Sequence, residues 1–228
     1  PDSDATPVAA GAPAAPVKFT GTGMTLYGAV QLGSPLTLPA CGGSLFYNLT
    51  PGGLGAIMGP TINAACVGNR DGGSATLAAR LVRATDVKLA AVDYVLVGLD
   101  AGKCPDWKSN SGSCVMGVAL KDGVVASVGF YTGDDNFEKP ILKNLVSKLK
   151  AKPSKQSESN CQNNASAQYG LTTRKGQQYF WKVPGMVSSY WTTGGQTCEQ
   201  GAVVVSTQAF EDALQKSIAK TEDSQPQL

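Results

Sequence analysis

The six cysteines of this chain constrain its fold and its surroundings more than any other feature. None of them forms a C-x-x-C pair, and the chain contains no histidine, which excludes zinc-finger, thioredoxin-like and His-dependent catalytic sites. An even number of cysteines spread through loops rich in Gly, Ser and Asn predicts three disulfides. The cysteines are Cys41, Cys66, Cys104, Cys114, Cys161 and Cys198.

Pairing in sequence order is the favoured arrangement among the 15 that six cysteines allow. It joins Cys41 to Cys66, Cys104 to Cys114, and Cys161 to Cys198. The second pair is the most secure because its loop is short and leads into a hairpin. The alternative is six free, buried thiols in a cytosolic protein, since free cysteine is often buried.

Disulfides indicate an oxidising compartment, namely the periplasm, the cell surface or the extracellular space. Residues 1–17 are rich in Ala and Pro and are expected to form a flexible tether. Such tethers follow a cleaved signal peptide or a lipid-anchored cysteine upstream, and the context suggested is a bacterial envelope. No apolar run approaches the roughly 20 residues of a membrane helix. Residues 18–222 are expected to form one domain, with a weak subdivision near 110, and residues 223–228 a disordered tail.

A β-hairpin is the clearest local element. Residues 115–121 and 124–131 flank Asp122-Gly123, which suits a two-residue type I′ turn. The implied register pairs Leu120 with Val125, Ala119 with Ala126, and Val118 with Ser127. Both faces of this hairpin are apolar, so it is expected to be covered on both sides.

A helix over residues 137–150 is predicted by apolar residues that recur every three or four positions, with Pro140 in the first turn. The small residues on the Gly117 face of the hairpin leave room for a helix, and we expect this one to pack there. Further strands are predicted at 24–31, 87–99, 178–183, 186–191 and 201–206, and a second helix at 208–220.

The order of these elements indicates an α+β fold, an antiparallel sheet with helices packed on one face and stabilised by disulfides. The elements do not alternate strictly, so a Rossmann-type sheet is not expected. Residues 75–84 fit a strand or a helix, and residues 40–73 are expected to be a long loop with at most one short helix.

Candidate catalytic residues are few. Asp93 lies within an apolar segment, where burial would raise its pKa, or it is exposed or paired with Arg80 or Arg83. Asp134 and Asp135 are better read as helix caps than as paired acids. Asn69 and Asp71 hint at a calcium loop but lack its spacing. No cofactor and no metal site is expected.

Basic residues concentrate between positions 138 and 182. This stretch contains nine basic and two acidic residues, a net charge of +7. The rest of the chain is slightly acidic. This stretch could attract an anionic partner, a protein or an envelope component, or it could be an ordinary solvated surface. Nucleic acid is not an expected partner. The binding residues named from it are Lys143, Lys150, Arg174 and Lys175.

A second candidate surface is aromatic. Adjacent residues of a strand point to opposite faces, so at least one aromatic in each late strand should face away from the core, unless a loop or helix covers both faces. Exposed Trp and Tyr are typical of binding surfaces. The residues concerned are Trp107, Tyr179, Trp181, Tyr190 and Trp191.

The function expected from these patterns is that of a non-enzymatic envelope protein with a rigid binding surface, such as an inhibitor, immunity or assembly module. One alternative is a carboxylate-dependent hydrolase of cell-wall or other polysaccharides, in which Asp93 and a second acid would act across a cleft. Another is a structural surface domain, which self-association would reveal.

Overall fold

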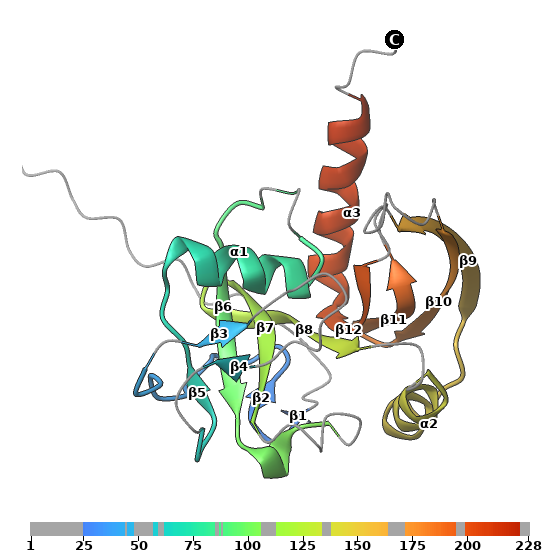
Figure 1. Ribbon diagram of the computed structural model, residues 1–228. Helices are drawn as coiled ribbons and strands as arrows, with labels where there is room; N and C mark the ends of the chain where they lie inside the picture. The colour runs from blue at the N-terminus through green and yellow to red at the C-terminus, as the bar shows by residue number, and fades with distance from the viewer. Residues whose placement is uncertain are drawn as a thin grey trace, which may run out of the picture.

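An eight-stranded antiparallel sheet, in the order β5-β6-β7-β8-β12-β11-β10-β9, forms the centre of the computed structural model (Figure 1). The structure describes residues 25–43, 45–47, 57–58, 62–84, 87, 89–105, 113–133, 138–163, 172–194 and 199–223. The predicted α+β class with disulfide stabilisation is confirmed.

The elements in chain order are β1 (Thr25–Leu26), β2 (Val30–Gln31), β3 (Phe46–Tyr47), β4 (Ile57–Met58), β5 (Cys66–Val67), α1 (Gly72–Leu81), β6 (Val92–Leu99), the 3-10 helix η1 (Ala101–Lys103), β7 (Cys114–Lys121), β8 (Val124–Gly133), α2 (Glu138–Leu149), β9 (Lys155–Asn163), β10 (Thr172–Val183), β11 (Met186–Gly194), β12 (Glu199–Thr207) and α3 (Gln208–Asp223).

The central hairpin of β7 and β8 has the predicted turn. Asp122 and Gly123 both have positive φ, 52° and 79°, as a type I′ turn requires. Leu120 pairs with Val125, as expected. The hairpin is covered on both faces, since every residue of β7 up to Leu120 is buried.

The expected register beyond Leu120 is wrong by one residue. A β-bulge between Ala119 and Leu120 makes Val118 pair with Val128, where the sequence predicted Ser127. A bulge places one extra residue on one strand, so the side chains beyond it change face. Val128 therefore joins the core cluster that contains Val118.

Two glycines of this hairpin lie directly under α1. A Cβ on Gly117 would lie 2.6 Å from the carbonyl oxygen of Ala78, and a Cβ on Gly129 would lie 2.0 Å from that of Leu81. A helix thus packs on the small-residue face of the hairpin, as the sequence suggests. The prediction that residues 137–150 form this helix is wrong. The helix that packs there is α1, and it includes most of residues 75–84, which by sequence fit either a strand or a helix.

Asp71 is the N-cap of α1. Its carboxylate accepts a hydrogen bond from the Ser74 backbone N–H at 2.8 Å and another from the Ser74 hydroxyl at 3.1 Å. Both bonds hold the pKa of Asp71 below its usual value. The acidic residue that hinted at a calcium loop therefore serves to begin a helix.

The helices cover both faces of the sheet, not only one. α1 and α3 share a face, because Val82 and Ala119 belong to the same core cluster as Phe210 and Leu214. α2 packs on the opposite face through the buried residues Ile141, Leu145 and Leu149, together with the β1–β2 hairpin. Figure 1 shows α1 and α3 above the sheet and α2 below it.

The late strands and α3 occur where predicted but are longer. The Thr207 hydroxyl accepts a hydrogen bond from the Phe210 N–H at 3.2 Å and so caps α3. The edge strand β9 was not predicted, since its residues are polar on both faces. Residues 25–31 form a hairpin, where one strand was predicted over 24–31, and its turn contains Tyr27 and Gly28, both with positive φ.

Two of the predicted disulfides, Cys41–Cys66 and Cys104–Cys114, are present. The Cys161–Cys198 pair lies outside the described residues, as do the 1–17 tether and residues 224–228, whereas residue 223 ends α3. Among the described helices, none combines the length and apolarity that crossing a bilayer requires.

Candidate functional site

Three of the aromatic residues that the sequence predicted on a binding surface of the late hairpin are buried. Tyr179, Trp181 and Tyr190 are at most 8% exposed, and all three lie in the main core cluster. Phe180, between Tyr179 and Trp181, points to the opposite face of the sheet and is only half-buried, as the alternation predicts. The face that carries Tyr179, Trp181 and Tyr190 is the one covered by α2. The expectation that these residues offer a binding surface is therefore wrong.

Polar contacts fix two of these aromatic side chains within the core. The Tyr179 hydroxyl donates to the Glu138 carboxylate at the start of α2, and the Trp181 indole N–H donates to the Ala151 carbonyl at 3.1 Å. The rings of Tyr179 and Tyr190 stack at 5.9 Å. These contacts attach α2 and the residues after it to the sheet.

Four other predicted site residues fall outside what the structure describes. The position of Trp107 is not described, nor are the side chains of Trp191, Arg174 and Lys175. Their proposed binding roles stay predictions.

Asp93 lies at the exposed beginning of β6. The structure therefore has the exposed alternative for Asp93 and not the acid buried in an apolar segment. Within the described part of the chain, no group of three or more His, Cys, Asp or Glu side chains could hold a metal ion.

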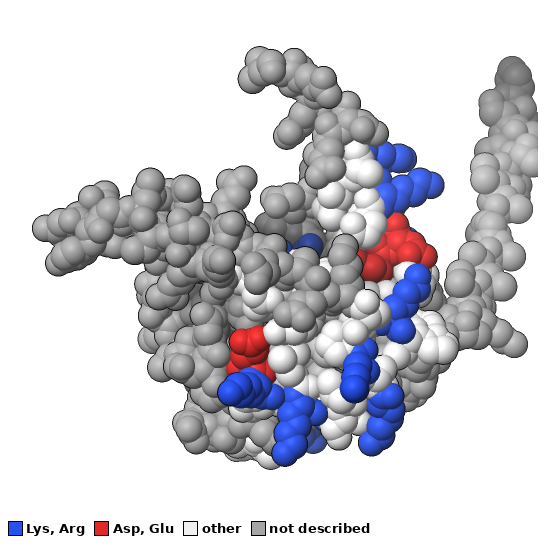
Figure 2. Space-filling view, turned by 90° about the vertical axis from the view of Figure 1, so that its right-hand side faces the viewer, with Lys and Arg blue, Asp and Glu red and all other residues white. Residues whose placement is uncertain are grey.

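The exposed side of α2 and of the residues after it is basic. Lys139 and Lys143 lie one helical turn apart, and Lys150 and Lys152 follow the helix; all four are exposed. We refer to these four residues as the lysine face. None of them forms an ion pair within the described residues. Figure 2 shows basic side chains gathered over the lower part of the molecule, where Figure 1 places α2.

A cavity of about 270 Å³ lies beside α2, on the flank away from Lys139 and Lys143. Three separate segments line it: the β1–β2 turn, η1 with the residues after it, and the second half of α2. The lining residues are Tyr27, Gly28, Gly102, Lys103, Cys104, Pro105, Asn144 and Lys148.

Two lysines bring positive charge to this cavity, and their surroundings differ. The Lys103 ammonium forms an ion pair with the Asp100 carboxylate at 3.0 Å. The Lys148 ammonium lies 4.8 Å from the centre of the Tyr27 ring, within the range of a cation–π interaction. Lys148 has no carboxylate partner among the described residues.

Asn144, one of the lining residues, carries an unsatisfied acceptor. Its Oδ1 atom is buried and accepts no hydrogen bond from the described residues. A buried polar atom without a partner costs about 1–3 kcal/mol, so such atoms are uncommon outside functional or water-filled sites.

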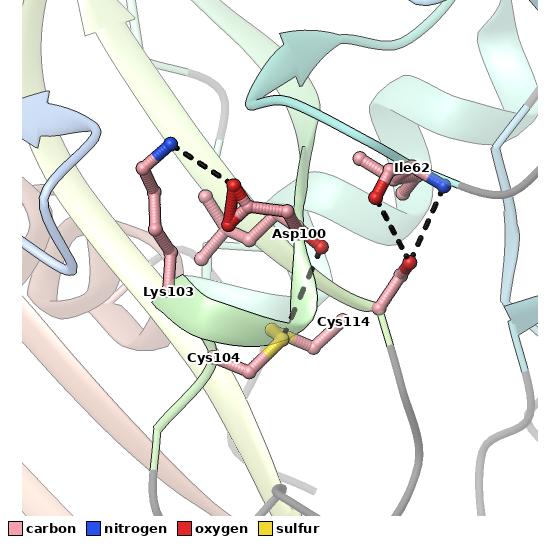
Figure 3. Close-up of a disulfide and its surroundings, with 7 residues drawn as sticks. Ile62, Asp100, Lys103, Cys104 and Cys114 are labelled. Carbon is pink, nitrogen blue, oxygen red and sulfur yellow. Dashed lines mark hydrogen bonds and ion pairs between the residues drawn. A yellow bond between two sulfur atoms is a disulfide. The ribbon is translucent and has the colours of Figure 1, made fainter.

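The rim of the cavity is held by a disulfide. Cys104 follows η1 and is joined to Cys114 at the start of β7, as Figure 3 shows. Next to Cys114, the Ser113 hydroxyl accepts a hydrogen bond from the Ile62 N–H at 3.3 Å (Figure 3). This bond attaches the start of β7 to the segment that precedes β5. Lys103 is thus attached to a rigid part of the fold.

Tyr27 forms the opposite wall. Its φ of 53° is unusual for a non-glycine residue and places the ring against Phe130, with the two ring centres 4.5 Å apart. Burial raises the pKa of the Tyr27 phenol above its usual range, so the ring stays neutral under Lys148 at physiological pH. The turn thus places the Tyr27 ring beneath the Lys148 ammonium.

The sequence did not reveal the cavity, because its residues come from positions 27–28, 102–105 and 144–148 and share no motif. Lys148 was recognised only as one of many basic residues. No protein-family model matches the chain, and no curated protein or solved structure matches it.

Proposed function

We propose that this protein is a non-enzymatic binding protein of an oxidising compartment, at the periplasmic or outer surface of a cell, that attaches to anionic lipid headgroups. The lysine face would be the contact surface. The observation that carries the proposal is that its four lysines, two on α2 and two just after it, are exposed and form no ion pair within the described residues.

The composition of this surface favours a headgroup array over a protein partner. Residues 138–152 contain no arginine and no aromatic residue. Protein interfaces are enriched in Tyr, Trp and Arg and depleted in Lys, and the nearby aromatic residues Tyr179 and Trp181 are buried. A fluid array of headgroups can also adjust to lysines at unequal spacing, which a rigid protein partner cannot do.

The attachment would be electrostatic. The apolar residues of α2, Ile141, Leu145 and Leu149, are buried in the core and are not available to enter a bilayer. A lysine near an anionic surface contributes about 1 kcal/mol, so four contribute about 4 kcal/mol. Interactions of this kind are screened by salt, which gives the proposal a clear signature.

The two disulfides support the choice of compartment, because such bonds persist outside the cytosol. The hydrolase alternative has less support, because Asp93 is exposed at the start of β6 and is not buried among apolar residues. No comparable observation favours the structural surface domain.

Co-sedimentation with lipid vesicles tests the proposal. Vesicles of phosphatidylcholine alone are compared with vesicles that also contain phosphatidylglycerol, at low and at physiological ionic strength. The test variant is Lys139→Gln/Lys143→Gln, and the matched control is Lys216→Gln/Lys220→Gln, which removes the same charge at the same spacing from α3. We expect binding only to anionic vesicles, weakened about 10- to 30-fold in the test variant.

Equal weakening by both double variants would show that only net charge matters and would contradict a specific role for the lysine face. A wild-type protein that does not bind anionic vesicles at low salt would overturn the proposal. Self-association without lipid binding in sedimentation velocity would favour the structural domain instead.

A further inference from the structure

We infer that β9 pairs with the β9 strand of a second copy of this chain, so that two sheets join into one. β9 lies at the end of the eight-stranded sheet and, within the described residues, pairs only with β10 (Figure 1). Its outer side therefore presents backbone N–H and C=O groups that no strand of the described part of the chain bonds. Dimer formation does not depend on lipid attachment through the lysine face.

β9 lacks the features by which edge strands avoid such pairing. Protected edges are short, bulged, interrupted by proline or rich in charge. β9 pairs with β10 over nine consecutive residues without a register shift, and it contains no proline. Its only charged residues are Lys155 and Glu158, so residues 159–163 carry no charge. The result is a regular edge about 30 Å long that another strand can join.

The opposite edge of the sheet is already occupied. β5 has two residues, and residues 39–41 cover its outer side. The Cys41 N–H donates to the Val67 carbonyl at 2.8 Å, and the Val67 N–H donates to the Pro39 carbonyl at 2.8 Å. The Cys41–Cys66 disulfide holds this segment in place. β9 of one copy thus cannot add to β5 of another, so pairing through β9 closes at a dimer.

The two charges of β9 favour antiparallel pairing. When identical strands pair in parallel and in register, Lys155 lies beside Lys155 and Glu158 beside Glu158, which is unfavourable. The antiparallel register centred on Ser159 pairs all nine residues of each strand. It places Lys155 opposite Asn163 of the second copy, and Glu158 opposite Asn160. This register forms about eight to ten backbone hydrogen bonds and opposes no like charges.

The dimer would carry both lysine faces on one side. Antiparallel strands of one sheet share its two faces, so the face covered by α2 in one copy continues into the face covered by α2 in the other. If the lysine face binds anionic headgroups, the two copies would bind the same membrane together and more tightly than one. This consequence rests on the proposed function, whereas the dimer itself does not.

Two measurements on the wild-type protein, made without lipid, test the dimer. In sedimentation velocity, the sedimentation coefficient should rise with protein concentration from the monomer value to the dimer value and no further. In hydrogen-exchange mass spectrometry, peptides that cover β9 should exchange more slowly at high than at low concentration, since pairing protects the N–H groups that point away from β10. Peptides that cover β5 should not change, because that edge is already bonded within the chain.

Variants at Ser159 locate the interface. In the expected register this residue lies opposite itself, so Ser159→Lys and Ser159→Glu each oppose like charges and should raise the dimer dissociation constant by up to about fivefold. An equimolar mixture of the two variants opposes unlike charges and should dimerise at least as tightly as the wild type. Ser159 pairs with Gly176, so no β10 side chain lies directly opposite the introduced one. Ala219→Lys, at an exposed position of α3, is the charge control and should leave dimerisation unchanged.

Several results would overturn the inference. A sedimentation coefficient that stays at the monomer value would exclude the dimer, and growth beyond the dimer would contradict a closed interface. Concentration-dependent protection outside β9 but not within it would place the interface elsewhere, and this measurement decides the question even if the Ser159 variants fail to fold. A mixture of folded Ser159→Lys and Ser159→Glu that dimerises no better than either alone would exclude the register. Equal weakening by Ala219→Lys would show that net charge alone controls association. Because no lipid is present, failure here and failure of lipid attachment are separate outcomes.

Discussion

At the scale of single residues, burial controls the ionisation of tyrosines in this protein. Burial raises the pKa of Tyr94, and burial together with the neighbouring Glu138 carboxylate raises the pKa of Tyr179 to about 12. The hydroxyl of Tyr179 donates its hydrogen bond to that carboxylate, so a phenolate there would lose the bond and face a like charge. Tyr179 therefore fixes α2 only while it is protonated.

This predicts a loss of stability at alkaline pH. The unfolded chain releases the Tyr179 proton near pH 10, and the folded protein does so near pH 12. The contribution of Tyr179 is thus complete below pH 10 and is lost as the pH rises from 10 to about 12. Urea unfolding across this interval should show a steeper loss of the free energy of unfolding for the wild type than for Tyr179→Phe.

A second variant tests the part of the raised Tyr179 pKa that Glu138 adds to the larger effect of burial. Glu138→Gln removes the carboxylate charge, so the Tyr179 phenol should ionise at a lower pH than in the wild type, as followed by phenolate absorbance. If Tyr179 ionised near pH 10 in the folded wild-type protein, the account of its environment would be wrong.

The sequence left the environment of each aromatic residue undetermined. Alternation along β10 shows that Phe180 and Trp181 face opposite sides, and this is what the structure has. Which side is covered depends on where α2 packs, and that is a tertiary property. The placement of Trp181 in the core, with its indole N–H bonded to Ala151, could not be read from β10 alone.

At the scale of elements, the strongest local sequence signals predicted the secondary structure correctly. The features that depend on pairing or packing with distant residues were not predicted. The Asp122-Gly123 turn and the α2 periodicity were sufficient for their elements, because turn geometry and helix amphipathicity are local. The polar strand β9 has no apolar alternation and is held by its backbone pairing with β10. The bulge at Ala119 and the helix that covers Gly129 depend on residues distant in sequence.

The contact of α1 with the sheet predicts a severe effect of Gly129→Ala. The added methyl carbon would lie 2.0 Å from the Leu81 carbonyl oxygen, which is backbone and cannot rotate away. Overpacking of this kind costs about 1–3 kcal/mol or more, and we expect a loss of this size in urea unfolding. Gly72→Ala, in the first turn of α1 with no atom within 4 Å of the new carbon, is the control and should be neutral or stabilising.

A Gly129→Ala protein as stable as the wild type would contradict the close packing of α1 on β8. Native-state hydrogen exchange gives an independent measure, since loosening of this contact should raise exchange in α1 before it does so in α2 on the other face.

At the scale of the whole molecule, covalent bonds and packing play separate parts. The cysteine pattern was enough to predict the two described disulfides, because chain order and loop length favour sequential pairing. The same pattern gave no indication of the cavity, which forms where three segments meet around Tyr27 and Lys148. Sites of this kind follow from the tertiary fold, so composition and motifs do not reveal them.

The disulfide framework gives the last prediction. The native protein, alkylated without reduction, should carry no label by mass spectrometry, whereas reduction should expose six thiols. Peptide mapping should recover Cys41–Cys66 and Cys104–Cys114, and the remaining two cysteines should be found joined as Cys161–Cys198. Loss of the Cys104–Cys114 bond should cost about 3 kcal/mol, because it frees a short loop in the unfolded chain. Label on Cys161 or Cys198 before reduction would disprove the third bond, and label on all six would remove the argument for an oxidising compartment.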